Sequence, residues 1–135
     1  MESIWPGHDV KKAKTYLYTC LSYLRRTLQE SGMPIAVEKA GNGFAIRLNG
    51  AESDAGVIES LLDEILAADE PDRQLYDRAN RLYRGEYMEG CDYVWAMPRQ
   101  EAIQAKYILS LRTMHLHFRR RGEMALAVDS LRRVL

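Results

Sequence analysis

The clearest hydrophobic pattern in the chain runs from residue 10 to residue 29. Its apolar side chains recur at steps of three and four, so they share one face of a helix: Val10, Ala13, Leu17, Leu21, Leu24 and Leu28. Asp9 precedes the pattern in the place of an N-cap, with a carboxylate able to accept from the free amides of the first turn. Gly32 and Pro34 follow it as breakers. We therefore predict a helix over residues 10–29 with an apolar back.

The opposite face of this helix is basic and rich in hydroxyl groups. Its residues are Lys11, Lys12, Thr15, Tyr18, Thr19, Ser22, Arg26 and Gln29. The segment holds five Lys and Arg residues and no Asp or Glu. Such a face has the charges and donors that contact with a DNA groove requires. A surface helix with a solvated basic face gives the same pattern, so periodicity alone leaves both interpretations open.

A second pattern, of alternating apolar residues, predicts a β-hairpin over residues 35–48. Ile35 and Val37 alternate with polar or small neighbours, and so do Phe44, Ile46 and Leu48. Residues 40–43 between the two runs read Ala-Gly-Asn-Gly, which is strong turn chemistry. The hairpin would carry Lys39 and Arg47 as nearby cations and Asn42 at its tip.

The pattern after a short linker at residues 50–53 predicts four helices in an antiparallel pack. The first begins at a cap, Ser53 or Asp54, and runs to about residue 68; the second follows Pro71 and ends at Gly85 or Gly90. The third covers about residues 99–121 and the fourth residues 123–135. Their apolar stripes are Val57, Ile58, Leu61, Leu62, Ile65 and Leu66; Leu75, Ala79, Leu82 and Tyr83; Ile103, Tyr107, Leu111, Met114 and Phe118; and Ala127, Val128, Leu131 and Val134.

Composition places the chain among globular proteins. Its 135 residues are long enough to bury a core, and 47% of them are hydrophobic and 28% charged. No run approaches the about 18–20 apolar residues of a membrane span, and the start of the chain lacks the pattern of a signal peptide. Cys20 and Cys91 have no metal-ligand or redox spacing, so we expect a reduced, cytoplasmic compartment and no membrane partner.

The net charge of zero hides an asymmetry between the two parts of the chain. Residues 1–50 hold seven Lys and Arg against four Asp and Glu, whereas residues 51–135 hold twelve against fifteen. We therefore expect a polyanion partner to bind the first part.

Catalytic chemistry is not indicated. His8, His115 and His117 are too scattered for a metal site, and no nucleophile motif, phosphate loop or catalytic acid pair is present. We predict no enzyme activity, no cofactor and no metal. Tyr93 and Trp95 are able to line a ligand groove, but aromatic residues at a helix entry are more often core. Residues 119–121, all Arg, fit either a second contact with an anion or a solvated helix end, and the latter is the favoured interpretation because cations favour the carbonyl terminus.

Three motifs of the first part together resemble a known DNA-binding fold. Ile4-Trp5-Pro6-Gly7, then residues 21–28 (LSYLRRTL), then Gly41-Asn42-Gly43-Phe44 are similar to the OmpR-type winged helix of bacterial activators of the Streptomyces antibiotic regulatory protein class. In that family these motifs close the helix before the turn, lie in the recognition helix and form the wing. The resemblance covers the C-terminal portion of that domain, so we expect further strands and a helix upstream, with a receiver domain before them as one option. Ala40 departs from the family, which often has a cation there.

The second part resembles the helical module that follows the winged helix in the same regulators, the bacterial transcriptional activator domain. Residues 82–85 (LYRG) and 93–99 (YVWAMPR) carry this likeness. The residues Leu111, Met114, His115, Phe118, Gly122, Ala127 and Leu131 also fit the spacing of a tetratricopeptide repeat. The resemblance implies a mainly α chain with a partial winged helix-turn-helix at 1–50 and truncated tetratricopeptide-like repeats at 51–135.

The resemblance further implies a DNA-binding transcriptional regulator, with helix 10–29 in the major groove and the wing, residues 40–44, on the backbone. The residues that we assign to DNA contact are Lys11, Lys12, Thr15, Thr19, Ser22, Arg26, Lys39 and Asn42. The repeats would bind protein, with RNA polymerase as one partner. The alternative is a helical-repeat interaction module that does not bind DNA.

The apolar back of helix 10–29 would need a cover. If Leu17, Leu21, Leu24 and Leu28 were wet, the chain would forgo roughly 1.5–3 kcal/mol for each one otherwise fully buried. We expect a homodimer to cover them, or else a fold-back onto the helix at Leu61 and Ile65.

Overall fold

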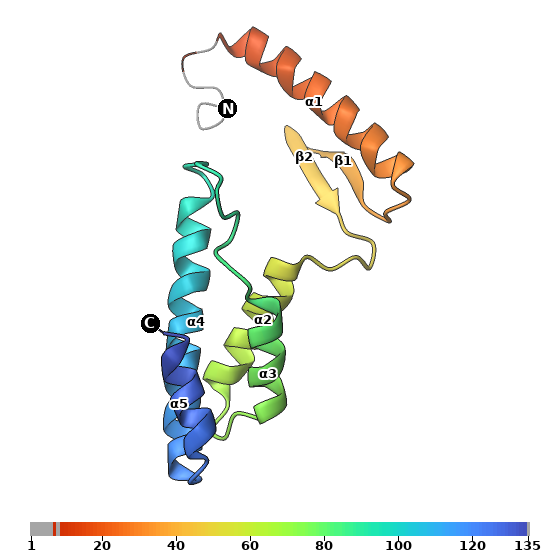
Figure 1. The fold of residues 1–135 in the computed structure, drawn as a ribbon. Helices are drawn as coiled ribbons and strands as arrows, with labels where there is room; N and C mark the ends of the chain where they lie inside the picture. The colour runs from red at the N-terminus through yellow and green to blue at the C-terminus, as the bar shows by residue number, and fades with distance from the viewer. Residues whose placement is uncertain (1–6, 8, 135) are drawn as a thin grey trace. The chain divides into compact units, whose positions relative to one another are not determined.

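The computed structural model describes residue 7 and residues 9–134 of the chain. Helix accounts for 61% of these described residues, in five helices, and their remaining regular structure is one two-stranded antiparallel hairpin (Figure 1). A mainly α fold is thus confirmed. The chain forms two compact units, Met1–Glu52 and Ser53–Leu135. The Trp5 motif, His8 and Leu135 lie outside the described residues.

The first unit begins with the helix α1 (Val10–Glu30), in the segment where apolar periodicity predicts it. Asp9 occupies the N-cap position, as predicted. Its side chain makes no capping hydrogen bond, so the prediction that it accepts from the first-turn amides is wrong. The carboxylate is exposed instead, where its charge still favours the positive end of the helix. At the other end the Ser31 hydroxyl donates to the Leu28 carbonyl at 2.8 Å, and Gly32 has a positive φ of 67°.

The hairpin consists of β1 (Ala36–Ala40) and β2 (Gly43–Arg47). Ala40 pairs with Gly43, which leaves a loop of two residues, Gly41 and Asn42. Gly41 has a φ of 55° whereas Asn42 has a negative φ, and this is the pattern of a type II′ turn, which has glycine first. The loop therefore agrees with the turn chemistry of the sequence.

The hairpin covers the apolar back of α1. Leu21, Leu28 and Val37 are buried together, with Leu17, Ile35 and Phe44 packed around them. Arg25 lies across this contact: its Nε donates to the Val37 carbonyl at 3.0 Å, and its guanidinium is 5.8 Å from the centre of the Phe44 ring. The guanidinium of Arg25 thus binds the hairpin.

This packing corrects two expectations about the back of α1. Leu21 and Leu28 are each only 8% exposed, so a second chain is not needed to cover them. Exposure also varies over the apolar face, because Val10 is 63% and Leu24 40% exposed. Val10 lies on the same side of the helix as Leu28 but at its opposite end, and Leu24 lies toward the edge of that side.

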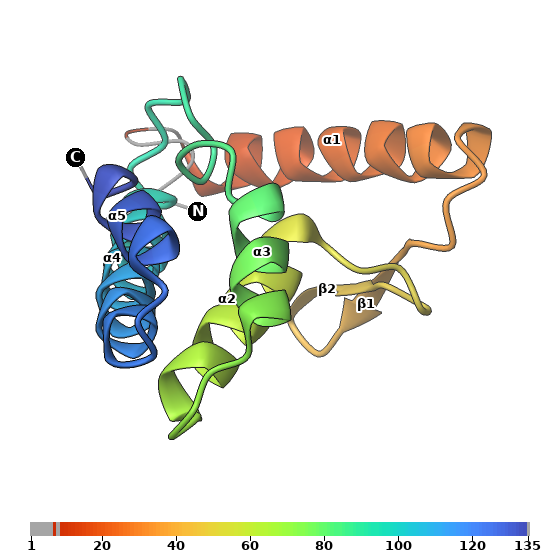
Figure 2. The ribbon, with the colours of Figure 1, turned by 60° about the horizontal axis from the view of Figure 1, so that its bottom comes forward.

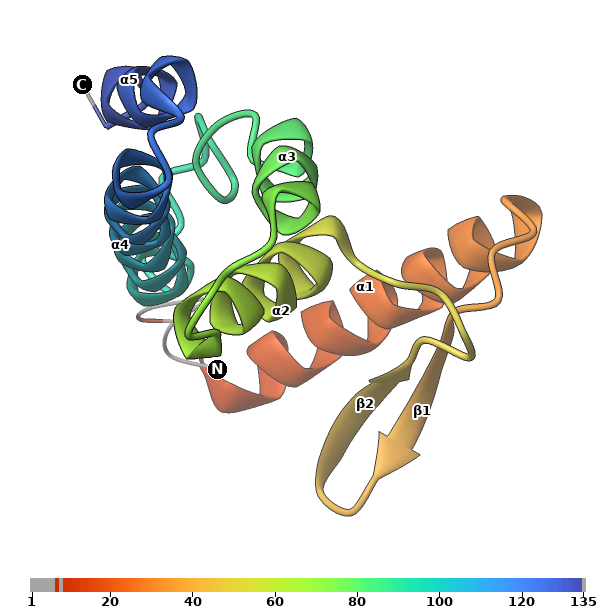
Figure 3. The same ribbon diagram turned by 90° about the horizontal axis from the view of Figure 1, so that it is seen from below.

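The second unit holds the helices α2 (Asp54–Ala67), α3 (Arg73–Leu82), α4 (Met97–Arg120) and α5 (Met124–Arg132). α2 packs on both α3 and α4, and α5 packs on α4 (Figure 2; Figure 3). The predicted cap of α2 forms, because the Ser53 hydroxyl accepts from the Gly56 amide at 3.1 Å. A cap that was not predicted begins α3, where Asp72 accepts from the Gln74 amide at 3.1 Å. Gly122, with a φ of 76°, separates α4 from α5.

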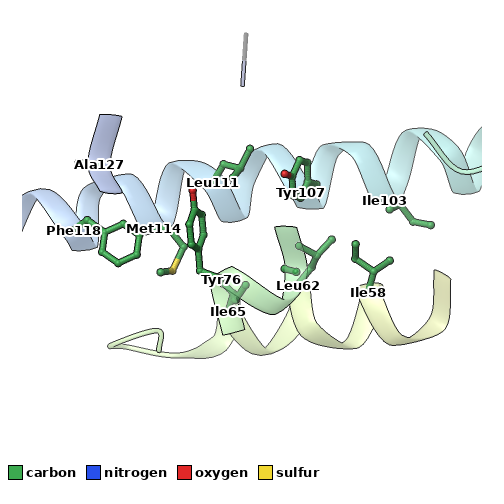
Figure 4. Close-up of a cluster of buried hydrophobic side chains, with 11 residues drawn as sticks. Ile58, Leu62, Ile65, Tyr76, Ile103, Tyr107, Leu111, Met114, Phe118 and Ala127 are labelled. Atoms are coloured by element: carbon green, nitrogen blue, oxygen red, sulfur yellow. The ribbon is translucent and has the colours of Figure 1, made fainter. Parts of the chain in front are cut away.

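The core of the second unit lies between α2 and α4 and is closed by α3 and α5 (Figure 4). All five apolar positions predicted for the long helix are in it. The buried residues are Ile58, Leu62, Ile65, Tyr76, Ala79, Ile103, Tyr107, Leu111, Met114, Phe118 and Ala127. Ile65 is 1% exposed inside this cluster, so it offers no surface for the fold-back that was the alternative to a dimer.

The two short helices keep only part of their predicted stripes in the core: Ala79 and Ala127 are buried, and Leu75, Tyr83 and Val134 pack against the cluster. α3 ends at Leu82, before either predicted glycine, and it buries Tyr76 while Leu82 is 37% exposed. In α5, Val128 and Leu131 are 48% and 44% exposed. Ser130 is fully buried, and the hydrogen bond from its hydroxyl to the Leu126 carbonyl at 2.7 Å satisfies it there.

The aromatic residues at the entry to α4 are not core. Tyr93 and Trp95 are 47% and 49% exposed, and their rings stack on each other with centres 5.4 Å apart. The expectation that they are buried is therefore wrong.

Candidate nucleic-acid interface

Six of the eight residues assigned to DNA contact come together on the outer face of α1. At about 100° per residue they fall within an arc of about 100°, opposite the side that carries Leu21 and Leu28. All six are exposed: Lys11, Lys12, Thr15, Thr19, Ser22 and Arg26. We call this set the outer face. Since the hairpin packs on the other side of the helix, it does not cover the outer face.

The three cations of the outer face differ in their partners. Lys11 and Lys12 form no ion pair with any described residue. Arg26 pairs through Nε with Glu30, one turn later, at 2.8 Å. Both side chains of this pair are largely in water, with 76% and 64% of their surface exposed. An exposed pair of this kind is weak, so a phosphate is able to compete for Arg26.

The hydroxyl groups of the outer face also differ. Thr15 donates to the Lys11 carbonyl at 3.1 Å and Thr19 to the Thr15 carbonyl at 3.0 Å. Their oxygens keep lone pairs that accept from base amino groups, such as those of adenine and cytosine in the major groove. Ser22 forms no hydrogen bond with the described residues, so its hydroxyl is free to donate as well.

Tyr23 belongs to the same surface, although the sequence analysis did not assign it. It is 68% exposed and lies three residues before Arg26 and four after Thr19, so it adjoins both on the helix. Its position on the helical wheel, next to Thr19 and Arg26, is the sequence feature that could have predicted this. A tyrosine hydroxyl is among the groups that donate to DNA phosphates.

Two further cations of α1 do not belong to the outer face. Lys14 and Arg25 fall on the side of the helix that meets the hairpin, and Arg25 is bound to the Val37 carbonyl there. The five positive charges counted in the sequence thus reduce to three on the outer face, one of them paired.

The remaining two assigned residues lie on the hairpin. Lys39 is exposed and has no ion pair among the described residues; its cross-strand neighbour is Phe44. Asn42 is exposed in the two-residue loop. Arg47 is bound to Glu38 at 3.2 Å, which leaves it a weaker candidate. Lys39 and Asn42 therefore form a separate element of the candidate interface.

A polar cluster of Tyr76, Asp129 and Arg133 in the second unit has a structural role. The Tyr76 hydroxyl donates to Asp129 at 2.9 Å, and Arg133 donates through Nε to the same carboxylate oxygen at 2.9 Å. The hydrogen bond from Arg133, followed by that from Tyr76, holds the pKa of Asp129 below its usual value, whereas burial raises the pKa of Tyr76. The cluster clamps α3 to α5.

Other kinds of site find little support in the described part of the chain. No group of three or more His, Cys, Asp and Glu there is arranged to hold a metal ion. The Nδ1 atom of His115 lies 2.9 Å from the Ala127 carbonyl, a contact that joins α4 to α5. Among the described helices, none combines the length and the apolar character needed to cross a membrane.

Comparison with known proteins identifies no relative. No family model matches the chain, and neither a curated protein nor a solved structure matches it.

Proposed function

We propose that the chain is part of a bacterial transcriptional regulator that binds DNA through a winged helix, with α1 in the major groove and the hairpin as the wing. The observation that carries the proposal is the outer face of α1, which gathers Lys11, Lys12 and Arg26 with three hydroxyl residues and stays clear of the hairpin. An α-helix about 10–12 Å wide fits a major groove about 12 Å wide.

Each residue of the interface has a role that follows from its chemistry. Lys11 and Lys12 bind phosphates as point charges, and Arg26 does so once it leaves Glu30. Thr15, Thr19 and Ser22 approach base edges. Lys39 and Asn42 place the wing on the backbone, and they add affinity for all sequences without selecting one.

The second unit has a different role in this proposal. It is a tetratricopeptide-like module that binds protein, with RNA polymerase as a candidate partner. The exposed Tyr93 and Trp95 support a protein-binding role, since aromatic residues dominate the energetics of interfaces. The alternative is an interaction module that does not bind DNA. The ion pair between Arg26 and Glu30 supports it, because this pair neutralises part of the positive charge of the outer face.

The proposal is tested by exchanging one cation at a time in the intact protein. Lys12→Ala removes a charge from the outer face, whereas Lys14→Ala removes the same charge from the same helix at an exposed position on the hairpin side. We expect Lys12→Ala to weaken binding to a random-sequence duplex by roughly threefold to tenfold in about 0.1 M salt, and Lys14→Ala to change it much less. Fluorescence anisotropy of a labelled duplex measures both. Equal losses in the two variants would mean that α1 attracts DNA only through its overall charge.

A further inference from the structure

A small cavity opens in the second unit between the start of α2, the end of α3 and the connection from α3 to α4. Its volume is about 240 Å³. Its apolar lining includes Ile58, Leu82 and Ile103, and Ile58 faces Ile103 across the gap between α2 and α4 (Figure 4). This volume is below the about 300–1,000 Å³ of typical small-ligand pockets, so it suits one side chain better than a whole ligand.

Two carboxylates line the same cavity, and neither is neutralised. Glu86 accepts from the side-chain amides of Gln100 at 2.6 Å and Gln104 at 3.4 Å, which hold it in place without cancelling its charge. Asp54 accepts from the Ala55 amide at 2.7 Å. Neither has a cationic partner within 4.0 Å among residues 9–134. The start of α2 contributes only about half a positive charge against these two negative ones, so the cavity favours a cation.

Two tyrosine rings form another part of the lining. Tyr83 is fixed by stacking on Tyr107, with ring centres 3.8 Å apart. Tyr87 already holds one guanidinium: that of Arg99 lies 5.0 Å from the centre of its ring and pairs with Glu59 at 2.7 Å. A guanidinium between an aromatic face and a carboxylate is thus an arrangement that this region makes with its own residues.

We propose that this cavity binds the side chain of an arginine from a partner protein. The aliphatic stem of an arginine packs on Ile58, Leu82 and Ile103, and its guanidinium reaches Asp54 and Glu86. A protein is favoured over a free amine because the connection that forms one wall continues into exposed apolar residues: Tyr93, Val94, Trp95 and Met97. Such residues anchor protein partners. The site lies wholly in the second unit and does not depend on the DNA-binding proposal.

Binding is tested by NMR titration of the intact protein with N-acetyl-arginine N-methylamide. The matched control is the citrulline analogue, which has nearly the same shape and no charge. We expect saturable shifts of the backbone amides at residues 54–58 and 82–88, and at least tenfold weaker binding of the citrulline probe. The variants Glu86→Gln and Asp54→Asn should each weaken the arginine probe at least fivefold. Glu64→Gln, at an exposed acid of α2 outside the cavity, should leave it unchanged.

The source of the cation is tested with two more probes. A short peptide with one arginine between apolar residues should bind at least tenfold more tightly than the blocked amino acid, and its shifts should extend to residues 93–97. Free agmatine binding as tightly as that peptide would overturn the assignment to a protein. Absence of saturable shifts, equal binding of the citrulline probe, or unchanged binding in both Glu86→Gln and Asp54→Asn would overturn the site itself.

Discussion

The ion pair between Arg26 and Glu30 reduces the positive charge of the outer face of α1. The helix predicted from the apolar pattern ends at residue 29, so Arg26 has no acidic neighbour within it, although the spacing of four residues to Glu30 is that of a helical ion pair. In water this pair contributes only about 0.3–0.5 kcal/mol to stability. It is therefore easily replaced by a contact with phosphate.

We predict that Glu30→Gln strengthens DNA binding. The substitution releases Arg26 and removes a negative charge from the surface that meets the phosphates, so affinity for a random-sequence duplex should rise by about threefold to tenfold in about 0.1 M salt. Anisotropy titration measures the change, and Glu52→Gln, at an exposed acid outside α1, is the control. Unchanged or weaker binding by Glu30→Gln would show that Arg26 does not meet DNA.

Asp129 gives a pH-dependent prediction at the same scale. Its pKa in the folded chain lies below the ordinary value of 3.8, chiefly because Arg133 and Tyr76 donate to it. A lowered pKa means that its contribution to stability is present above about pH 4 and is lost as the pH falls through the folded pKa. Asp129→Asn should therefore be less stable than the parent chain at pH 6, by about 1 kcal/mol, and this difference should shrink as the pH is lowered toward 2.5.

Urea unfolding at the two pH values measures this difference. Asp69→Asn, at an exposed carboxylate with no ion pair among the described residues, is the control. A constant gap between Asp129→Asn and the parent chain from pH 6 to pH 2.5 would contradict the clamp between α3 and α5.

The elements show what local patterns specify and what they leave open. The predicted long helix of the second unit has all five of its apolar positions in the core, and the Gly41-Asn42 loop forms the tight turn that its sequence favours. The buried positions of the short helices α3 and α5 were harder to predict, because the orientation of a short helix depends on the elements that it packs against. In α5, Ser130 has the polar character of a surface residue, yet it is buried and its hydroxyl donates to the Leu126 carbonyl, whereas Val128 and Leu131 are exposed.

The packing of the hairpin on α1 could not be predicted from the sequence patterns of the two elements. The apolar side chains of the hairpin and those of the helix were both identified, but nothing in either period says that Val37 and Phe44 meet Leu21 and Leu28. Tertiary contact decides this, not local pattern. Of the candidate site, the helix positions were predictable from the wheel, whereas the binding of Arg25 to the hairpin was not.

We predict that Leu21→Ala and Leu24→Ala differ in cost, although both are leucines of α1 within one turn of each other. Leu21 is 8% exposed beneath the hairpin and Leu24 is 40% exposed. Leu21→Ala should lower the free energy of unfolding by about 2–3 kcal/mol and Leu24→Ala by less than about 1 kcal/mol. Urea unfolding followed by circular dichroism measures both, and amide exchange of β1 reports the hairpin directly. Equal costs would show that the hairpin does not cover Leu21.

At the scale of the whole molecule, the two units carry opposite charge and different surfaces. The positive balance lies in the first fifty residues, with the outer face of α1, and the negative balance lies in the remainder, with the cavity of Asp54 and Glu86. A polyanion and a cationic protein segment are therefore suited to different units. This division supports a regulator that binds DNA with one unit and a protein with the other.

The salt dependence of DNA binding by the intact protein tests this account most directly. Four phosphate contacts, by Lys11, Lys12, Arg26 and Lys39, predict a slope of log K against log salt of about −3 to −4 for duplex DNA. The double variant Lys12→Ala plus Arg26→Ala should bring the slope about two units closer to zero, with the fold unchanged by circular dichroism. A slope near zero in the parent protein, or the same slope in the double variant, would contradict the account.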